Sequence, residues 1–180
     1  MLFRSILVTG KNWFGSYFTK KLLITVSYPE EKMPLPENSR NFPFLVYDDN
    51  EPEANLRCTA CKICEKECPP ACIHIVVEQD EKGKPIKHPR VFEIDISICM
   101  SCQICVEVCP FESIKMDSAY EYSSYERMHS LILTKKELAK SNQYYHSIKS
   151  TEASEVDARL EEERKRKEEA RQKKAAANVG

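Results

Sequence analysis

Nine of the 180 residues are cysteines, and eight of them fall into two short groups with the same internal spacing. The two groups are Cys58, Cys61, Cys64 and Cys68, and then Cys99, Cys102, Cys105 and Cys109. Each group reads C-x2-C-x2-C-x3-C-P, and the second copy follows the first at an offset of 41 residues. An odd number of cysteines packed this closely argues against a disulfide framework and favours metal ligation in a reducing compartment.

The repeat extends beyond the cysteines, since Ile63 matches Ile104 and Ile73 matches Ile114. Two copies of this motif are the signature of bacterial-type ferredoxins, which bind a pair of [4Fe–4S] clusters. We therefore predict an α+β fold with a 2×[4Fe–4S] ferredoxin-like core. The internal repeat predicts pseudo-twofold symmetry, with short strands flanking each cysteine loop.

The spacing also predicts which cysteines share a cluster. Three cysteines at intervals of three wrap one face of a cubane, and the fourth lies one helical turn further on, so it is directed toward the other cluster. The predicted ligands are Cys58, Cys61, Cys64 and Cys109 for the first cluster, and Cys68, Cys99, Cys102 and Cys105 for the second. Zinc is the alternative, but zinc sites usually use paired C-x2-C knuckles.

Residues around the motifs support a small mixed core. Ile73–Glu78 and Arg90–Asp95 alternate apolar and polar residues and are predicted as strands, with a turn over residues 80–83 between them. We expect four apolar side chains of the motifs to shield the clusters from water: Ile63, Ile104, Val106 and Val108.

The remaining chemistry-bearing residues receive structural interpretations. Cys72 stands where the second copy has Ser113, and it is interpreted as a small packed residue, with a redox-sensing thiol as the less favoured alternative. His74, His88, His129 and His146 have no metal-binding spacing, and a proton-coupled role for His74 is favoured less than a surface or packing role. No nucleophilic or paired-carboxylate arrangement is present. The chain is predicted to carry electrons and to have no substrate-transforming site of its own.

Composition argues against three further classes of protein. The net charge of −1 does not favour nucleic-acid binding, and only four glycines are present, without a phosphate-binding loop. No run approaches the roughly 18 apolar residues of a membrane span.

Residues 1–28 form a predicted amphipathic segment for a membrane surface or a docking partner. Residues 1–29 contain four basic residues and no acidic one. On a helical wheel one apolar arc contains Phe3, Ile6, Leu7, Trp13, Phe14, Tyr17 and Phe18. A helix docked on a partner protein and a transit peptide are the alternatives.

The rest of the chain divides by composition. Residues 29–56 contain five prolines and are predicted as an extended linker, and residues 57–118 as the two-cluster ferredoxin domain. Residues 119–150 are predicted as a C-terminal docking segment. Residues 151–180 form a charged tail, either helical or disordered, with balanced i,i+4 charge pairs and no apolar face to bury.

The run Tyr28-Pro29-Glu30-Glu31-Lys32, preceded by the amphipathic segment and followed by both cysteine motifs, resembles subunit I of NADH-quinone oxidoreductase, respiratory complex I. Residues 117–122 and 135–138 are also similar to this family. The resemblance implies an electron-relay subunit that passes electrons through two [4Fe–4S] clusters from the flavin side toward the quinone-reducing end, while the whole complex translocates protons. All eight motif cysteines carry over as cluster ligands.

The resemblance also implies partners and a location. The chain is expected to bind peripheral-arm and membrane-arm subunits, with residues 1–28 on the membrane surface, and to bind no nucleic acid and no small-molecule substrate by itself. The expected location is peripheral on the cytoplasmic face of the bacterial cell membrane, ahead of an organellar inner membrane. The alternatives are a related ferredoxin- or hydrogenase-linked membrane oxidoreductase, a freely diffusing ferredoxin and a zinc-stabilised interaction module.

Overall fold

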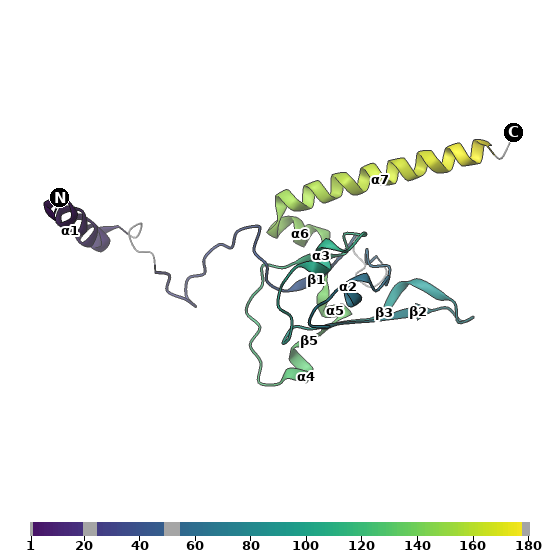
Figure 1. Cartoon of the computed structure of the whole chain (residues 1–180), viewed down its shortest axis with the longest axis horizontal. Helices are drawn as coiled ribbons and strands as arrows, with labels where there is room; N and C mark the ends of the chain where they lie inside the picture. The colour runs from purple at the N-terminus through teal and green to yellow at the C-terminus, as the bar shows by residue number, and fades with distance from the viewer. Residues whose placement is uncertain (1, 20–24, 49–54, 178–180) are drawn as a thin grey trace. The chain divides into compact units, whose positions relative to one another are not determined.

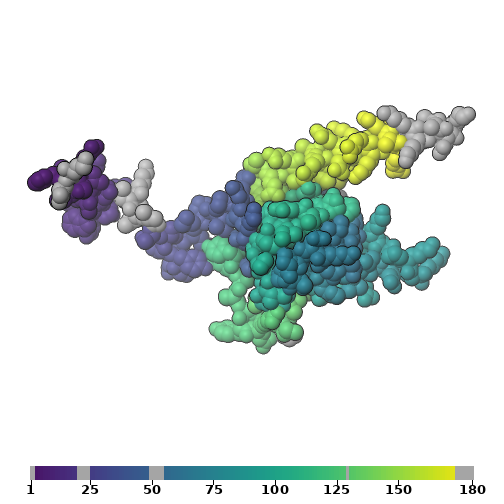
Figure 2. Space-filling model, viewed as in Figure 1, coloured from purple at the N-terminus to yellow at the C-terminus, as the bar shows by residue number. Residues whose placement is uncertain are grey.

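A computed structural model describes residues 2–19, 25–48 and 55–177. The chain divides into two compact units, Met1–Leu35 and Pro36–Gly180. Figure 1 shows the elements of both units, and Figure 2 shows their surfaces.

The first unit contains the helix α1, Leu2–Phe18, which confirms the helix predicted for this segment. Its apolar side chains are exposed, for example Phe3 at 85% and Trp13 at 63%. Trp13 contacts Tyr17 with ring centroids 5.4 Å apart. In the described part of the chain, no helix combines the length and the hydrophobicity needed to cross a membrane.

The second unit contains two three-stranded sheets. Its strands are β1 (Pro43–Tyr47), β2 (Ile73–Gln79), β3 (Pro85–Asp95), β4 (Ile114–Met116), β5 (Ile132–Thr134) and β6 (Ala139–Ser141). In one sheet the order is β4-β1-β6, with β1 antiparallel to β4 and parallel to β6. In the other sheet β3 lies between β2 and β5 and is antiparallel to both. The two strands predicted beside the motifs are confirmed as β2 and β3.

The helices of the second unit are mostly short. They are α2 (Ile63–Lys66), α3 (Ile104–Glu107), α4 (Arg127–Ser130), α5 (Lys135–Leu138), α6 (Asn142–Ile148) and α7 (Ser150–Ala177). α2 and α3 are the single turns that follow the second cysteine of each motif. Helix α5 begins at a capping box in which Thr134 and Glu137 bond each other's backbone N–H groups.

The backbone repeats together with the sequence. Non-glycine residues with positive φ occur in pairs at the repeat offset: Ala60 and Ser101 (52° and 51°), Lys62 and Gln103 (61° and 71°), and Ala71 and Glu112 (51° and 51°). The strand after each motif also pairs with the strand before the other motif, β2 with β3 and β4 with β1. The two halves therefore have the same local backbone conformation, and each pairs one of its strands with a strand of the other half.

The prediction of an extended linker over residues 29–56 is wrong for the C-terminal part of this range. Strand β1 lies there and is the central strand of a sheet. Phe44, Leu45 and Val46 are at most 1% exposed. Pro43 fits because it is the first residue of the strand, where proline's missing N–H is tolerated. Burial of three consecutive apolar side chains outweighs the loop tendency of the surrounding prolines.

The two C-terminal segments also pack more than predicted. Residues 119–150, predicted as a docking segment, contribute β5 and β6 to the chain's own sheets. In α7, Ala153 and Val156 are buried, with exposed fractions of 0% and 3%. The expectation that this segment buries no apolar face is therefore wrong for its first turns. Residues 164–172 of α7 are all exposed.

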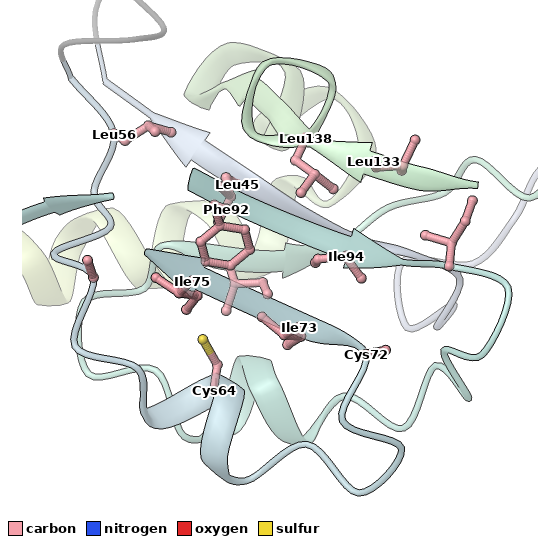
Figure 3. Close-up of a cluster of buried hydrophobic side chains, with 13 residues drawn as sticks. Leu45, Leu56, Cys64, Cys72, Ile73, Ile75, Phe92, Ile94, Leu133 and Leu138 are labelled. Carbon is pink, nitrogen blue, oxygen red and sulfur yellow. The ribbon is translucent and has the colours of Figure 1, made fainter. Parts of the chain in front are cut away.

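The main core lies between the sheets and the cysteine loops. Phe92 packs with Leu45 and Ile75, and the Cys64 sulfur points from α2 toward this cluster (Figure 3). Five other cysteines are partly buried against the same core: Cys58, Cys68, Cys99, Cys105 and Cys109. The packing therefore places the motif sulfurs at the edge of the hydrophobic core.

Candidate metal centres

The first candidate centre is a hollow with about 300 Å³ of empty space, including its open mouth. It is lined by four motif cysteines: Cys58, Cys61, Cys64 and Cys109. Three belong to the first motif and the fourth to the second. The other lining residues are Leu45, Thr59, Lys62, Ile75, Phe92, Phe111, Ser113 and Ile114. The wall between the sulfurs is therefore mainly apolar.

The second hollow has about 350 Å³ of empty space, and it takes three cysteines from the second motif and one from the first. Its motif cysteines are Cys68, Cys99, Cys102 and Cys105. Cys72 is a fifth cysteine in its lining, and the other lining residues are Pro43, Pro69, Pro70, Ile73, Met100, Ser101, Gln103, Ile104 and Met116. All eight cysteines singled out in the sequence thus lie at one hollow or the other.

Local backbone conformation explains how three closely spaced cysteines line one hollow. In the first motif, left-handed residues at Ala60 and Lys62 turn the chain sharply on either side of Cys61. The single turn of α2 then places Cys64 on the core side, while Cys68 follows one turn later and lines the other hollow. Left-handed conformations cost about 1–2 kcal/mol for non-glycine residues, so tertiary contacts must maintain them.

Burial raises the pKa of three motif thiols, those of Cys58, Cys64 and Cys105. It raises the pKa of Cys64 to about 12 and that of Cys105 to about 12, and neighbouring cysteines act in the same direction. Such thiols are protonated at neutral pH without a metal. Since metal ligation requires thiolates, metal binding here must release protons.

Cys72 is buried and contacts two motif cysteines. Its Sγ atom lies 3.4 Å from Cys68 Sγ. A hydrogen bond with Cys99 is the largest cause of two opposite shifts: it raises the pKa of Cys72 and lowers that of Cys99 to about 6. The proton therefore belongs to Cys72, which acts as a donor to its neighbour. The packed role predicted for Cys72 agrees with its 7% exposure.

The hollows fit [4Fe–4S] clusters by the chemistry of their donors. Each combines four cysteine sulfurs with an apolar wall, the donor set and surroundings that such a cluster takes in proteins. No carboxylate lines either hollow. The residues present thus match this cofactor in number and type.

The apolar shield differs in part from the one predicted. Val106 is buried, and Ile104 lines the second hollow. Ile63, in α2, is 37% exposed, so the prediction that it shields a cluster from water is wrong. The strand residues Leu45 and Met116 also line the hollows and were not predicted to do so. The only available signal for Met116 was its repeat match to Ile75.

Three of the four histidines lie beside carboxylates. His74 Nδ1 is 3.6 Å from Glu65 Oε1, and its side chain is 65% exposed. His88 pairs with Glu78, and His146 with Asp157. The side chain of His129 lies outside the described residues. These contacts agree with the surface role favoured for His74.

Comparison with known proteins assigns the segment that carries both motifs. Residues 57–113 match the family described as a 4Fe-4S dicluster domain. The cofactors of this segment are thus two [4Fe–4S] clusters, and the alternative of a zinc site is wrong.

Relatives extend the similarity beyond this segment. The chain is 42% identical over 98 residues to NADH-quinone oxidoreductase subunit I 2 of Symbiobacterium thermophilum, a match that covers 54% of this chain but only 40% of that relative. A chain in the structure of the membrane-bound sulfane sulfur reductase, an archaeal respiratory membrane complex, is 21% identical with a TM-score of 0.46, covering 78% of this chain and 69% of that chain.

Another NADH-quinone oxidoreductase subunit is matched almost end to end. NADH-quinone oxidoreductase subunit I of Francisella philomiragia is 34% identical over 158 residues, which covers 88% of this chain and 91% of the relative. The two motifs, the segments on either side of them and the dicluster match all agree with this similarity. The chain therefore belongs to the family of subunit I of NADH-quinone oxidoreductase.

Proposed function

We propose that this chain is the electron-relay subunit of a membrane-bound NADH-quinone oxidoreductase and passes electrons from the flavin side toward the quinone-reducing end. The observation that carries the proposal is the crossed lining of the two hollows. At each one, three cysteines of one motif meet the fourth cysteine of the other.

The ligand assignment follows from this crossing. The first cluster takes Cys58, Cys61, Cys64 and Cys109, and the second takes Cys68, Cys99, Cys102 and Cys105. Because Cys64 and Cys68 are one helical turn apart and serve different clusters, the two sites are adjacent. Proximity of this kind is required for electron transfer between them.

The chain's residues bind the cofactors and exclude water, and a [4Fe–4S] cluster when bound accepts and releases an electron. The buried side chains of Leu45, Ile75 and Phe92 form the dry wall of the first hollow. Ile73 and Met116, also buried, do the same at the second. Dry surroundings and hydrogen bonds to the sulfurs are the means by which a protein adjusts cluster potentials.

Pseudo-twofold symmetry of the cluster core is part of this proposal. It is supported by the paired left-handed residues at the repeat offset and by the pairing of β2 with β3 and of β4 with β1. A symmetric core gives both clusters the same ligand geometry, so differences between them must come from the residues that break the repeat.

We assign α1 to the membrane surface on the cytoplasmic face of a bacterial membrane, next to the partner subunits. Support comes from its exposed aromatic residues, including Trp13 and Tyr17, which suit the interface between lipid and water. Arg4 and Lys11 favour anionic lipid headgroups. A freely diffusing ferredoxin has no use for such a helix.

The test is affinity purification of the tagged full chain from membranes in a mild detergent, with identification of co-purifying subunits and an NADH–quinone assay on the eluate. Membranes with the untagged chain are the control. We expect flavin-binding and quinone-site subunits, NADH-driven quinone reduction and about eight iron atoms per chain.

Two outcomes would contradict the proposal. Recovery of a partnerless soluble protein with both clusters would indicate a free ferredoxin. Co-purification with a membrane complex that oxidises a ferredoxin or hydrogen, without NADH-driven activity, would indicate the related membrane oxidoreductase.

A further inference from the structure

Positions 72 and 113 are equivalent in the repeat, but one holds a thiol and the other a hydroxyl. Each follows a left-handed residue with φ of 51°, Ala71 or Glu112, so the backbone presents both side chains in the same way. Both are buried, Cys72 at 7% and Ser113 at 2% exposure. The two positions therefore place different hydrogen-bond donors, a thiol and a hydroxyl, in equivalent buried environments.

Ser113 lines the first hollow and already contacts one of its cysteines. Its backbone N–H donates to Cys109 Sγ at 3.4 Å. Its buried hydroxyl has no oxygen or nitrogen partner among the described residues. Burial raises the pKa of the Cys58 thiol, and a hydrogen bond from the Ser113 side chain opposes that rise. A buried hydroxyl without a partner costs about 1–3 kcal/mol. The sulfurs that line this hollow are acceptors that can remove this cost.

Cys72 lines the second hollow, 3.4 Å from Cys68 Sγ. Its thiol faces sulfur in the same way as the Ser113 hydroxyl does. An S–H group, however, is a weak donor, whereas a hydroxyl is a full one. The second site therefore receives the weaker hydrogen bond.

We propose that the Ser113 hydroxyl donates to a sulfur of the first cluster and that the Ser113–Cys72 difference gives the two clusters different reduction potentials. Reduction adds negative charge, and a donor aimed at a sulfur stabilises that charge and raises the potential. Ser113 thus raises the potential of the first cluster more than Cys72 raises that of the second. This inference rests on the ligand assignment of the proposed function.

The direct test uses Ser113→Ala and Cys72→Ser in the purified complex, with both midpoint potentials measured by EPR-monitored redox titration. Ser113→Ala removes the hydroxyl, so one midpoint should shift to a more negative value while the other stays unchanged. Cys72→Ser replaces a weak donor by a strong one, so the other midpoint should shift to a more positive value. The two variants must act on different signals, so no prior assignment of the signals is needed.

Ser113→Cys, which keeps a buried donor of similar size, covers the case in which Ser113→Ala loses its cluster. It should shift the same midpoint to a more negative value. Unchanged midpoints in these variants, a shift of either midpoint in the direction opposite to the one expected for it, or effects of both positions on one signal would overturn the inference. A wild-type complex without two [4Fe–4S] signals would instead refute the proposed function, so the two failures are distinguishable.

Discussion

The Arg57 guanidinium donates a hydrogen bond through Nη2 to Asp157 Oδ1 at 3.1 Å, which joins the residue before Cys58 to the N-terminal part of α7. The same guanidinium donates to Asp48 Oδ1 at 2.7 Å, and the Arg57 side chain is only 7% exposed. Asp157 also accepts hydrogen bonds from Asn142 and lies 2.7 Å from His146 Nε2. The charged C-terminal helix is therefore attached to the cluster domain by a polar network.

Asp157→Ala should lower the free energy of unfolding by about 1–3 kcal/mol, since it leaves a buried guanidinium with one carboxylate. The side chain of Asp157 is 31% exposed, which moderates the loss. Chemical denaturation of the cluster-loaded chain, followed by far-UV circular dichroism, measures the effect. Glu162→Ala, an exposed residue of the same helix, is the matched control and should change little. Equal stability of the two variants would mean that this attachment contributes nothing.

Asp117 is the most buried carboxylate of this unit among the described residues, at 2% exposure. It pairs with Lys140 and accepts a hydrogen bond from Tyr144 Oη at 2.6 Å. Burial raises its pKa, but the bonds from Lys140 and Tyr144 outweigh this and lower the pKa overall. The carboxylate is therefore ionised at neutral pH.

Asp117→Asn should destabilise the fold by about 3 kcal/mol, because it leaves Lys140 without its counter-charge in a partly buried site. Thermal unfolding against wild type measures the change as a lower Tm. The control is Glu81→Gln in the exposed turn between β2 and β3, which should leave Tm within error. A Tm for Asp117→Asn equal to that of wild type would show that the pair is replaceable.

The cluster sites were predictable from sequence because their determinants are local. The intervals between Cys58, Cys61 and Cys64 set the loop, and the four-residue step to Cys68 sets the crossing. The alternation in β2 and β3 is likewise a short-range signal. These features depend on backbone geometry over less than about three helical turns.

The missed features depend on contacts between distant residues. β1 lies in a proline-rich segment and becomes a central strand only by pairing with β4 and β6, for example Leu45 with Ile114 and with Ala139. The burial of Ala153 at the start of α7 depends on packing with Phe44 and Tyr145 in the same way. Local composition carries no information on such pairings, which explains why both segments were predicted as more exposed.

The ligand crossing predicts different effects for Cys68→Ser and Cys109→Ser. Cys68→Ser should damage the cluster held by Cys99, Cys102 and Cys105, and Cys109→Ser should damage the other, as seen in the two EPR signals. Because Cys72 Sγ is 3.4 Å from Cys68 Sγ, the double variant Cys68→Ser/Cys72→Ser removes any substitute thiol. Ser113 occupies the matching position beside Cys109, so that variant needs no such control. Loss of the Cys58-loop cluster in the double variant would refute the assignment.

The membrane role of α1 predicts that Trp13→Asp/Phe14→Asp releases the chain from lipid. Both side chains are more than 60% exposed, and both lie on the apolar arc. Replacing them by carboxylates removes apolar contact worth about 1.5–3 kcal/mol per side chain and adds repulsion from anionic headgroups.

Vesicle flotation of the full chain with anionic liposomes measures this effect as a lipid partition coefficient, which should fall at least tenfold, since about 1.4 kcal/mol corresponds to that factor in an equilibrium constant. Asn12→Asp lies on the opposite face of α1 and adds one negative charge without removing apolar surface, so it separates the two contributions. Retained binding by the double aspartate variant, or equal loss in Asn12→Asp, would show that the aromatic arc does not contact lipid and would assign α1 to a protein partner instead.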